Sequence, residues 1–100
     1  MKSKSQKMKE HILDCALILA NSVGYQNLRR DELARVAGVG QGTINLHFST
    51  MVQLKRAVMR AAIRYGEHRI VAQGLSISDP QALAADDHVK RNAAAYGLSS

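Results

Sequence analysis

The chain has 100 residues, of which 46% are hydrophobic, and its formal net charge is +6. This length provides for one small domain with at most a short appendage, and the apolar fraction excludes wholesale disorder. Proline occurs once and tryptophan is absent. Because residues that favour helices are abundant, the composition predicts an all-α protein, a small helical bundle.

Positive charge is concentrated in the first part of the chain. Residues 1–72 hold twelve Lys and Arg against five Asp and Glu, whereas residues 73–100 have a net charge of −1. A basic surface attracts polyanions through long-range fields and counterion release. Nucleic acid is therefore a candidate partner, and plain solubility explains the charge equally well when the charge is taken alone.

The single cysteine and the hydropathy pattern point to a cytoplasmic protein. Cys15 has no partner for an intramolecular disulfide, which fits a reducing compartment. Its apolar neighbours predict a small buried side chain. No signal peptide is recognisable, and no apolar run approaches the roughly eighteen residues that a transmembrane helix needs. We expect a nucleoid-associated protein in the cytoplasm with no membrane partner.

A long first helix is predicted after a lysine-rich start. Residues 1–7 are expected to form a basic flexible arm, because they have little to bury. From about residue 6 to residue 23, apolar side chains recur at helical spacing, with Ile12 and Ala16 in one row. Gly24 then stands where a left-handed cap would end the helix.

Two short helices are predicted next, over residues 30–37 and 41–47. Gly38 ends the first of them, and residues 39–40 form the turn. Ile44 is expected to face inward from the second helix.

A fourth helix is expected from a hydroxyl N-cap at Ser49 or Thr50 to about residue 72. Gly66 is a weak point inside it. Its core stripe has members at spacings of three and four, namely Leu54, Val58, Ala61 and Tyr65.

The last segment is predicted to be a linker at residues 74–78 and a fifth helix. Asp79-Pro80 is an N-cap followed by proline at the first helical position. The helix would run to about Tyr96 and end at Gly97, and its small alanine-rich face must pack on the fourth helix or on a second subunit. We therefore divide the chain into a flexible arm (1–7), a helical domain (8–73), and a linker with a short C-terminal helix that is a candidate dimerisation element (74–100).

The most specific local pattern is the spacing of Ala34, Gly38, Val39 and Ile44. Two short helices that meet at a steep angle need a small residue where their backbones approach. They also need a turn residue that tolerates positive φ and a branched aliphatic residue in the angle. This pattern predicts a helix-turn-helix, whose second helix enters the DNA major groove. An ordinary helical hairpin is the alternative.

Residues 24–58 have the sequence GYQNLRRDELARVAGVGQGTINLHFSTMVQLKRAV. This segment resembles the DNA-binding domain of the TetR family of bacterial transcriptional regulators, and the resemblance covers about residues 8–65. It implies that the helix beginning at Gln41 is the recognition helix. The resemblance is carried by Gly24-Tyr25, Leu33-Ala34, Ala37-Gly38-Val39, Gly42-Thr43, His47-Phe48 and Leu54.

Three positions depart from the family's usual pattern, in which threonine near position 29, tyrosine at position 45 and lysine at position 51 serve phosphate contacts. Here Arg29 and Arg30, Asn45 and Met51 stand there. Arginine binds phosphate strongly, and asparagine can pair bidentately with adenine. Methionine at position 51 removes the phosphate contact that lysine makes there in the family. The resemblance therefore implies DNA contacts that differ from the family's norm.

The resemblance implies a long C-terminal domain that binds a small ligand and forms the dimer, and few residues are available for such a domain here. About 30 residues follow the core part of the fourth helix, and a ligand cavity of several hundred cubic ångströms needs more chain around it. We therefore expect a domain that lacks the family's large ligand-binding domain and takes no small-molecule ligand and no cofactor.

Base contacts are expected near the start of the recognition helix, where side chains face base edges. Leu46 is suited equally to the core and to a thymine methyl group. Phosphate contacts are expected where arginines lie at a helix N-terminus, whose dipole attracts anions. The candidates for bases are Gln41, Gly42, Thr43, Asn45 and Leu46, and those for phosphates are Arg29, Arg30, His47, Lys55 and Arg56.

The lysines of the first nine residues are a candidate DNA arm, and a solubilising tail is the equally weighted alternative. Arg60 and Arg64 continue the spacing of Arg56, which is as typical of a solvated face as of a DNA contact. The lysines concerned are Lys2, Lys4, Lys7 and Lys9.

No grouping of residues indicates catalysis, so we expect a protein that is not an enzyme. His11, His68 and His88 are far apart in the sequence and lack the spacing of metal ligands, which predicts no metal site.

The sequence favours a sequence-specific regulator of transcription that binds double-stranded DNA. The most favoured form is a compact repressor, from a phage, a plasmid or a bacterium, that binds an inverted repeat as a homodimer through the fourth and C-terminal helices. Two alternatives remain. The first is an interaction module that keeps the fold and modulates another regulator, which Asn45 and Met51 support because they weaken the phosphate grip. The second is non-specific architectural binding.

Overall fold

The computed structural model describes the backbone of residues 2–99 and the side chains of residues 2–96. Every regular element in this part of the chain is a helix, which confirms the predicted all-α class. The elements are α1 (Lys4–Val23), the 3₁₀ turn η1 (Tyr25–Asn27), α2 (Arg30–Ala37), α3 (Gln41–His47), α4 (Met51–Tyr65), α5 (His68–Ser76), α6 (Pro80–Leu83) and α7 (Asp87–Ser99).

Helix α1 begins earlier than expected. Ser3 and Gln6 form a capping box: the Ser3 hydroxyl accepts the Gln6 N–H at 3.2 Å, and the Gln6 side chain accepts the Ser3 N–H at 2.9 Å. Two orphan donors of the first turn are thereby satisfied. Residues 4–7, expected in a flexible arm, are helical for this reason; Met1 lies outside the described residues.

The core of the N-terminal part lies where α1, α2, α3 and α4 meet. Helix α1 packs against α2 and α4, and α2 packs against α3. Ile12, Leu33, Ile44, Leu54 and Val58 are all completely buried there. Each helix thus contributes at least one large aliphatic side chain to a common apolar centre, and this burial supplies the main driving force for the bundle.

The turn between α2 and α3 has the predicted chemistry. Gly38 is left-handed, with φ 71° and ψ 32°, a conformation that favours glycine. The Val39 N–H bonds the carbonyl of Ala34 at 3.0 Å, which closes the end of α2. From α1, Nε2 of His11 donates to the carbonyl of Ala37 at 2.8 Å, so the long helix also fixes this turn.

Gly24, by contrast, does not form the expected left-handed helical cap. Its φ is 100° and its ψ is 142°, which is a positive φ in an extended backbone. The chain therefore leaves α1 and enters η1 directly, and the Gly24 N–H still bonds the carbonyl of Ala20 at 2.9 Å.

Helix α4 ends at Tyr65 and does not continue to residue 72. Thr50 is its N-cap and accepts the Gln53 N–H at 3.1 Å, as expected. Gly66 adopts the left-handed cap, and Glu67 N–H closes it on the carbonyl of Ala62 at 2.8 Å. Because the chain turns away here, Tyr65 is 60% exposed, so its assignment to the core stripe was wrong.

The expected linker at residues 74–78 is largely helical. Helix α5 runs through Gly74, which is buried against Met59 of α4 and Ala82 of α6. A residue without a side chain lets the three helices approach closely, so Gly74 is a packing position in a helix. Asp79 then caps α6 through the N–H groups of Gln81 and Ala82, as predicted.

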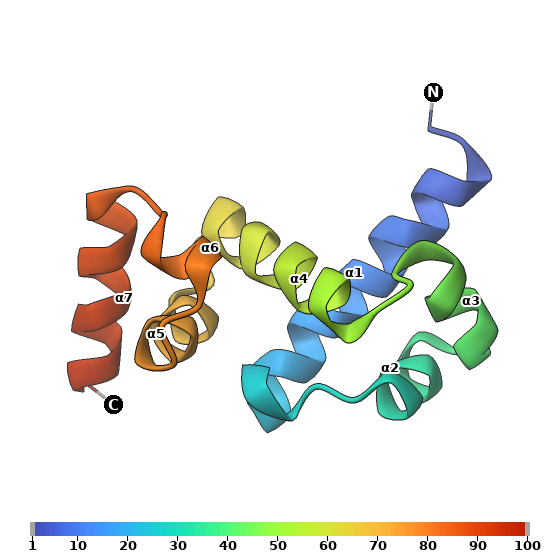
Figure 1. Ribbon diagram of the computed structural model, residues 1–100, viewed down its shortest axis with the longest axis horizontal. Helices are drawn as coiled ribbons and strands as arrows, with labels where there is room; N and C mark the ends of the chain where they lie inside the picture. Colours follow the sequence, from blue (N-terminus) through green and yellow to red (C-terminus); the bar gives the residue numbers. More distant parts are fainter. Residues whose placement is uncertain (1, 100) are drawn as a thin grey trace.

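The predicted fifth helix is two helices. After α6 ends at Leu83, α7 begins at Asp87 and continues past Gly97 to Ser99. Helix α7 packs on α5, not on α4. Figure 1 shows the result: α2 and α3 lie at one end of the long axis, α7 lies at the other, and α1 and α4 cross between them. No described helix is long and apolar enough to cross a membrane.

Candidate DNA-binding interface

One face of α3 is open to solvent. Gln41, Gly42, Asn45 and Leu46 are exposed, while Ile44 is completely buried. The four exposed positions form two pairs four residues apart, so they share one side of the helix. Thr43 and His47 are half-buried at its margins. Leu46 is 79% exposed, which excludes it from the core and leaves it available to a partner.

A hydrogen bond links the start of α2 to this face. Nη1 of Arg30 donates to Oδ1 of Asn45 at 2.6 Å, a short distance typical of charge-assisted bonds. Nε of Arg30 is buried and has no hydrogen-bond partner within the described residues. The Arg30 guanidinium therefore fixes the orientation of the Asn45 carboxamide. The NH₂ group of Asn45 remains available as a hydrogen-bond donor. This link joins residues fifteen positions apart and was not foreseen.

The N-terminus of α2 lies beside the start of α3. Its N-cap, Arg29, makes no capping hydrogen bond through its side chain, so the N–H groups of the first turn keep their capacity for an anion. The Arg29 guanidinium instead lies 3.4 Å from the carboxylate of Asp31, with both side chains largely exposed. A surface ion pair of this kind is weak and can be exchanged for a phosphate contact.

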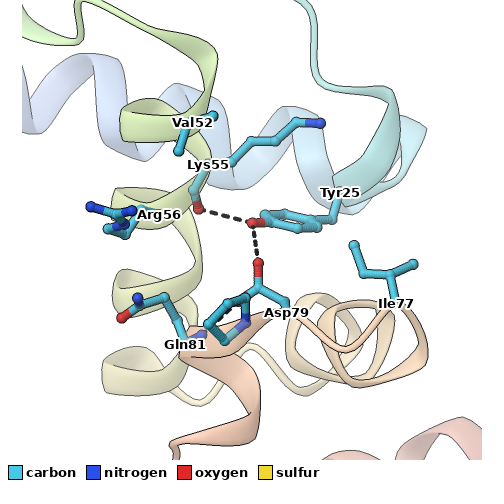
Figure 2. A pocket seen from close by; sticks show the side chains of 8 residues that line it. Tyr25, Val52, Lys55, Arg56, Ile77, Asp79 and Gln81 are labelled. Atoms are coloured by element: carbon cyan, nitrogen blue, oxygen red, sulfur yellow. Dashed lines mark hydrogen bonds between the residues drawn. The ribbon is translucent and has the colours of Figure 1, made fainter.

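The other phosphate candidates lie on α4 and beside it. Arg56 is exposed and lines both the cleft beside His47 and Phe48 and the cleft beside Lys55. Lys55 is half-buried, and its backbone carbonyl accepts the Tyr25 hydroxyl at 3.1 Å. Figure 2 shows Lys55 beside Tyr25, whose hydroxyl also bonds Asp79. The expected set of five phosphate contacts is therefore not one cluster.

The cleft in Figure 2 lies between α4 and the turn that leads to α6. It has a volume of about 260 Å³ and apolar walls formed by Val52, Ile77 and Pro80. Its floor is the bonded pair of Tyr25 and Asp79, whose polar atoms already have partners. The cleft thus joins the helix-turn-helix part to the C-terminal segment, and the absence of a small-molecule ligand stays a prediction.

The lysines of α1 have different surroundings. Nζ of Lys2 lies 2.8 Å from the carboxylate of Glu10, and their hydrogen bond raises the pKa of Lys2. Lys4 and Lys7 are exposed. Nζ of Lys9 lies 5.5 Å from the centre of the Phe48 ring, a cation–π contact that fixes it against the end of α3. Only Lys9 of the four candidates is therefore tied to the helix-turn-helix.

Two side chains near α3 were not among the candidates for the site. Phe48 carries Lys9, and Gln53 accepts hydrogen bonds from Ser49. Arg60, which the sequence left open between a solvated face and a DNA contact, lines the same cleft as Arg56. The spacing of Arg56 and Arg60 was the one available signal, because residues four apart share a helix face. No local sequence pattern predicts that α1 approaches the end of α3.

These features define the class of the protein before any comparison: a helix-turn-helix domain with an exposed second helix and a basic surround. A family model described as bacterial regulatory proteins, tetR family, matches residues 12–58. No curated protein and no solved structure matches the chain. The matched segment covers α2 and α3 completely and most of α1 and α4.

Residues 12–58 therefore form a helix-turn-helix domain similar to that of the TetR family. That family consists of DNA-binding regulators of transcription. The match also supports, at the family level, a protein that is not an enzyme. Within the described residues, no group of three or more His, Cys, Asp or Glu side chains is arranged to hold a metal ion.

Proposed function

We propose that the chain is a sequence-specific repressor of transcription that inserts α3 into the major groove of double-stranded DNA. The observation that carries this proposal is the exposed face of α3. This seven-residue helix buries Ile44 and leaves Leu46 79% exposed. Its exposed face is therefore available to bind DNA. A leucine this exposed, near the end of a short helix, gains from contact with an apolar group such as a thymine methyl.

Base recognition is assigned to Gln41, Asn45 and Leu46, with Gly42 allowing the backbone to approach the bases. In the free protein, Arg30 occupies one acceptor site of the Asn45 carboxamide. The carbonyl oxygen has a second lone pair and the NH₂ group is a donor, so Asn45 can still pair with adenine. Arg30 thus acts as a positioning residue that selects one orientation of the amide. Thr43, half-buried at the margin of this face, is assigned to a base or the adjacent phosphate.

Phosphate binding at the start of α3 is assigned to Arg29, Arg30 and the N-terminus of α2. The cleft there has a volume of about 450 Å³ and is lined by both arginines, Asp31, Gln41 and Met51. The arginines, the uncapped N–H groups and the helix dipole attract an anion at this place, while the carboxylate of Asp31, paired with Arg29, opposes it. His47, Lys55 and Arg56 remain assigned to phosphates from positions further along α3 and α4.

We further propose a homodimer that reads an inverted repeat from the cytoplasm, in association with the nucleoid. Exposed apolar side chains on the C-terminal segment, Ile77, Leu83 and Tyr96, favour this segment as the interface. Because α7 lies at the end of the molecule opposite α3 (Figure 1), contact there leaves both recognition helices open. The part of α4 that we assign to the interface is its C-terminal end, where the exposed Tyr65 lies against Arg64.

Selection of duplexes from a random library, followed by footprinting on the best ones, tests the proposal. We expect affinity for the selected duplex about 10³-fold or more above that for random DNA. Gln41→Ala and Asn45→Ala are each expected to lower this ratio by roughly 5- to 100-fold. Gln26→Ala and Asn92→Ala, at exposed positions outside α3, serve as matched controls. Enrichment of no duplex would refute the function, and a monomer in light scattering on the DNA complex would refute the dimer.

A further inference from the structure

The side chain of Arg30 reaches from the start of α2 to the exposed face of α3. Its Nη1 donates to Oδ1 of Asn45 at 2.6 Å. Arg30 is half-buried, and its Nε is a buried atom, so the protein encloses the inner edge of the guanidinium. Asn45, by contrast, is exposed on the side of α3 that we assign to the bases. A base-reading side chain is therefore in direct contact with a partly enclosed charge.

The chemistry of this contact decides which end of the Asn45 carboxamide faces Arg30. A guanidinium has only donors, whereas a carboxamide has an acceptor end and a donor end. The end at Arg30 must therefore be Oδ1, because a rotation of the amide by 180° would set its NH₂ group against the N–H groups of Arg30. A charge-assisted bond as short as 2.6 Å opposes this rotation. The NH₂ group is the end that remains for DNA.

The neighbouring arginine makes no such link to α3. The guanidinium of Arg29 lies 3.4 Å from the carboxylate of Asp31, in the first turn of its own helix α2. Both arginines line the cleft at the start of α3, so both can serve a phosphate. The bond to the recognition helix belongs to Arg30, and the pair of arginines therefore offers a comparison between charge alone and charge with orientation.

A carboxamide of fixed orientation distinguishes bases that a rotating one would accept. Guanine, adenine and thymine each present an acceptor in the major groove, whereas cytosine presents only its N4–H₂ donor. The NH₂ group of Asn45 can donate to any of the first three. Opposite cytosine, the only acceptor is the oxygen that already bonds Arg30, and the NH₂ group loses water without gaining a partner, which is costly. A rotating amide would avoid this cost by turning its oxygen toward cytosine.

We propose that Arg30 determines specificity at one base pair, by making Asn45 select a base with a major-groove acceptor and reject cytosine. Asn45 makes the base contact, and Arg30 is a positioning residue that acts through it. This inference rests on the proposed insertion of α3 into the groove, and it names the bases that one position of that site takes. A phosphate contact by Arg30 could not have this effect, because it carries no sequence information.

Affinities for duplexes that differ at one base pair test this role. Arg30→Gln is the informative variant, since the new amide has both a donor and an acceptor and can bond either orientation of Asn45. Arg29→Gln removes the neighbouring charge and is the matched control. Each position of a selected duplex is replaced by the other three bases, and the position whose preference disappears in Asn45→Ala is the one that faces Asn45. Circular dichroism melting confirms that each variant folds.

At that position, we expect the wild type to bind the cytosine duplex roughly 5- to 100-fold more weakly than the best of the other three, the range of one specific base contact. In Arg30→Gln this ratio should fall below about 5-fold, and in Arg29→Gln it should keep the wild-type value. Loss of a charge weakens binding to all four duplexes alike, so the ratio cancels that loss. In the Asn45→Ala background, Arg30→Gln should leave the ratio unchanged.

Equal ratios in Arg30→Gln and Arg29→Gln would overturn the inference while specific binding stays intact. Enrichment of no duplex would refute the proposed function and the inference together, so the two failures are distinguishable. NMR relaxation of the side-chain NH₂ groups tests the fixed orientation without DNA. We expect the NH₂ group of Asn45 to move less than that of Asn92, which is exposed on α7, and to gain mobility in Arg30→Gln. Equal mobility of the two asparagines in the wild type would contradict the role of Arg30.

Discussion

The hydroxyl of Tyr25 donates to Oδ2 of Asp79 at 3.0 Å and also lies 3.1 Å from the backbone carbonyl of Lys55. Tyr25 is 2% exposed, so one buried hydroxyl connects the turn after α1, the middle of α4 and the N-cap of α6 (Figure 2). Asp79 uses its other oxygen to accept the N–H groups of Gln81 and Ala82. The helix-turn-helix part and the C-terminal segment are joined through this contact.

Removal of this hydroxyl is expected to weaken the fold. In Tyr25→Phe the ring still fills its place, but the hydrogen bond to Asp79 cannot form, and we expect a decrease in the free energy of unfolding of about 1–2 kcal/mol. Urea denaturation measures it. Tyr65→Phe is the matched control, since Tyr65 is 60% exposed, and it should change the free energy by less than about 0.5 kcal/mol. Equal effects of the two substitutions would contradict the assigned role.

The same residue predicts a loss of stability in alkaline solution. Burial, and next the hydrogen bond to Asp79, raise the pKa of Tyr25 above its ordinary value. A raised pKa in the folded state stabilises the fold at every pH below the pKa of the unfolded chain, which is about 10 for tyrosine. This stabilisation is lost as the pH rises from there toward the folded-state pKa.

We therefore expect the stability difference between wild type and Tyr25→Phe to be constant from about pH 7 to pH 9 and to shrink above about pH 10. Urea denaturation of both proteins across this range checks it, and the comparison cancels the titration of the lysines. A difference that stays constant up to about pH 11 would show that Tyr25 has no raised pKa in the folded protein.

Two glycines inside helices should respond oppositely to alanine. A Cβ at Gly74 would collide with the end of Met59 and lie 3.0 Å from Cβ of Ala82, whereas a Cβ at Gly42 meets nothing within 4 Å. We expect Gly74→Ala to destabilise the protein by about 1–2 kcal/mol, because α4, α5 and α6 must move apart. Gly42→Ala should stabilise it by about 0.5–1 kcal/mol through helix propensity. Thermal melting distinguishes the signs, and stabilisation by both would refute the close packing around Gly74.

The two large aliphatic residues of α3 should separate stability from DNA binding. Ile44 is completely buried and Leu46 is 79% exposed. Ile44→Ala should therefore cost about 2–5 kcal/mol of stability. Leu46→Ala should leave stability within about 0.5 kcal/mol of wild type and weaken binding only to duplexes that place thymine opposite it. Loss of stability in Leu46→Ala, or an equal effect on all duplexes, would contradict its assignment to a base contact.

The helix-turn-helix was predictable because its determinants are local. The left-handed turn at Gly38 and the inward position of Ile44 follow from neighbouring residues, and so α2 and α3 have the bounds that the sequence predicted. The caps at Thr50 and Asp79 were equally visible, since a short polar side chain before a helix reaches N–H groups two or three residues ahead.

The predicted helix boundaries were wrong at positions where the local conformational preference of the residue allows more than one structure. Gly66 is equally compatible with a weak point inside a helix and with its end, and the packing of α5 against α4 decided for the end. Gly74 was assigned to a linker at residues 74–78. In the folded protein its small size lets Met59 and Ala82 approach, and the helix persists.

By itself, then, the sequence determined the helical class, the helix-turn-helix and the inward side of α3, because spacing along one helix decides which side chains share a face. Only the tertiary structure decided which distant charges meet. The pairing of Arg30 with Asn45, the placing of Lys9 over Phe48 and the convergence of Lys9 with Arg60 depend on how α1, α2 and α4 cross. Those crossings result from burial of apolar surface summed over the whole core, which no local pattern encodes.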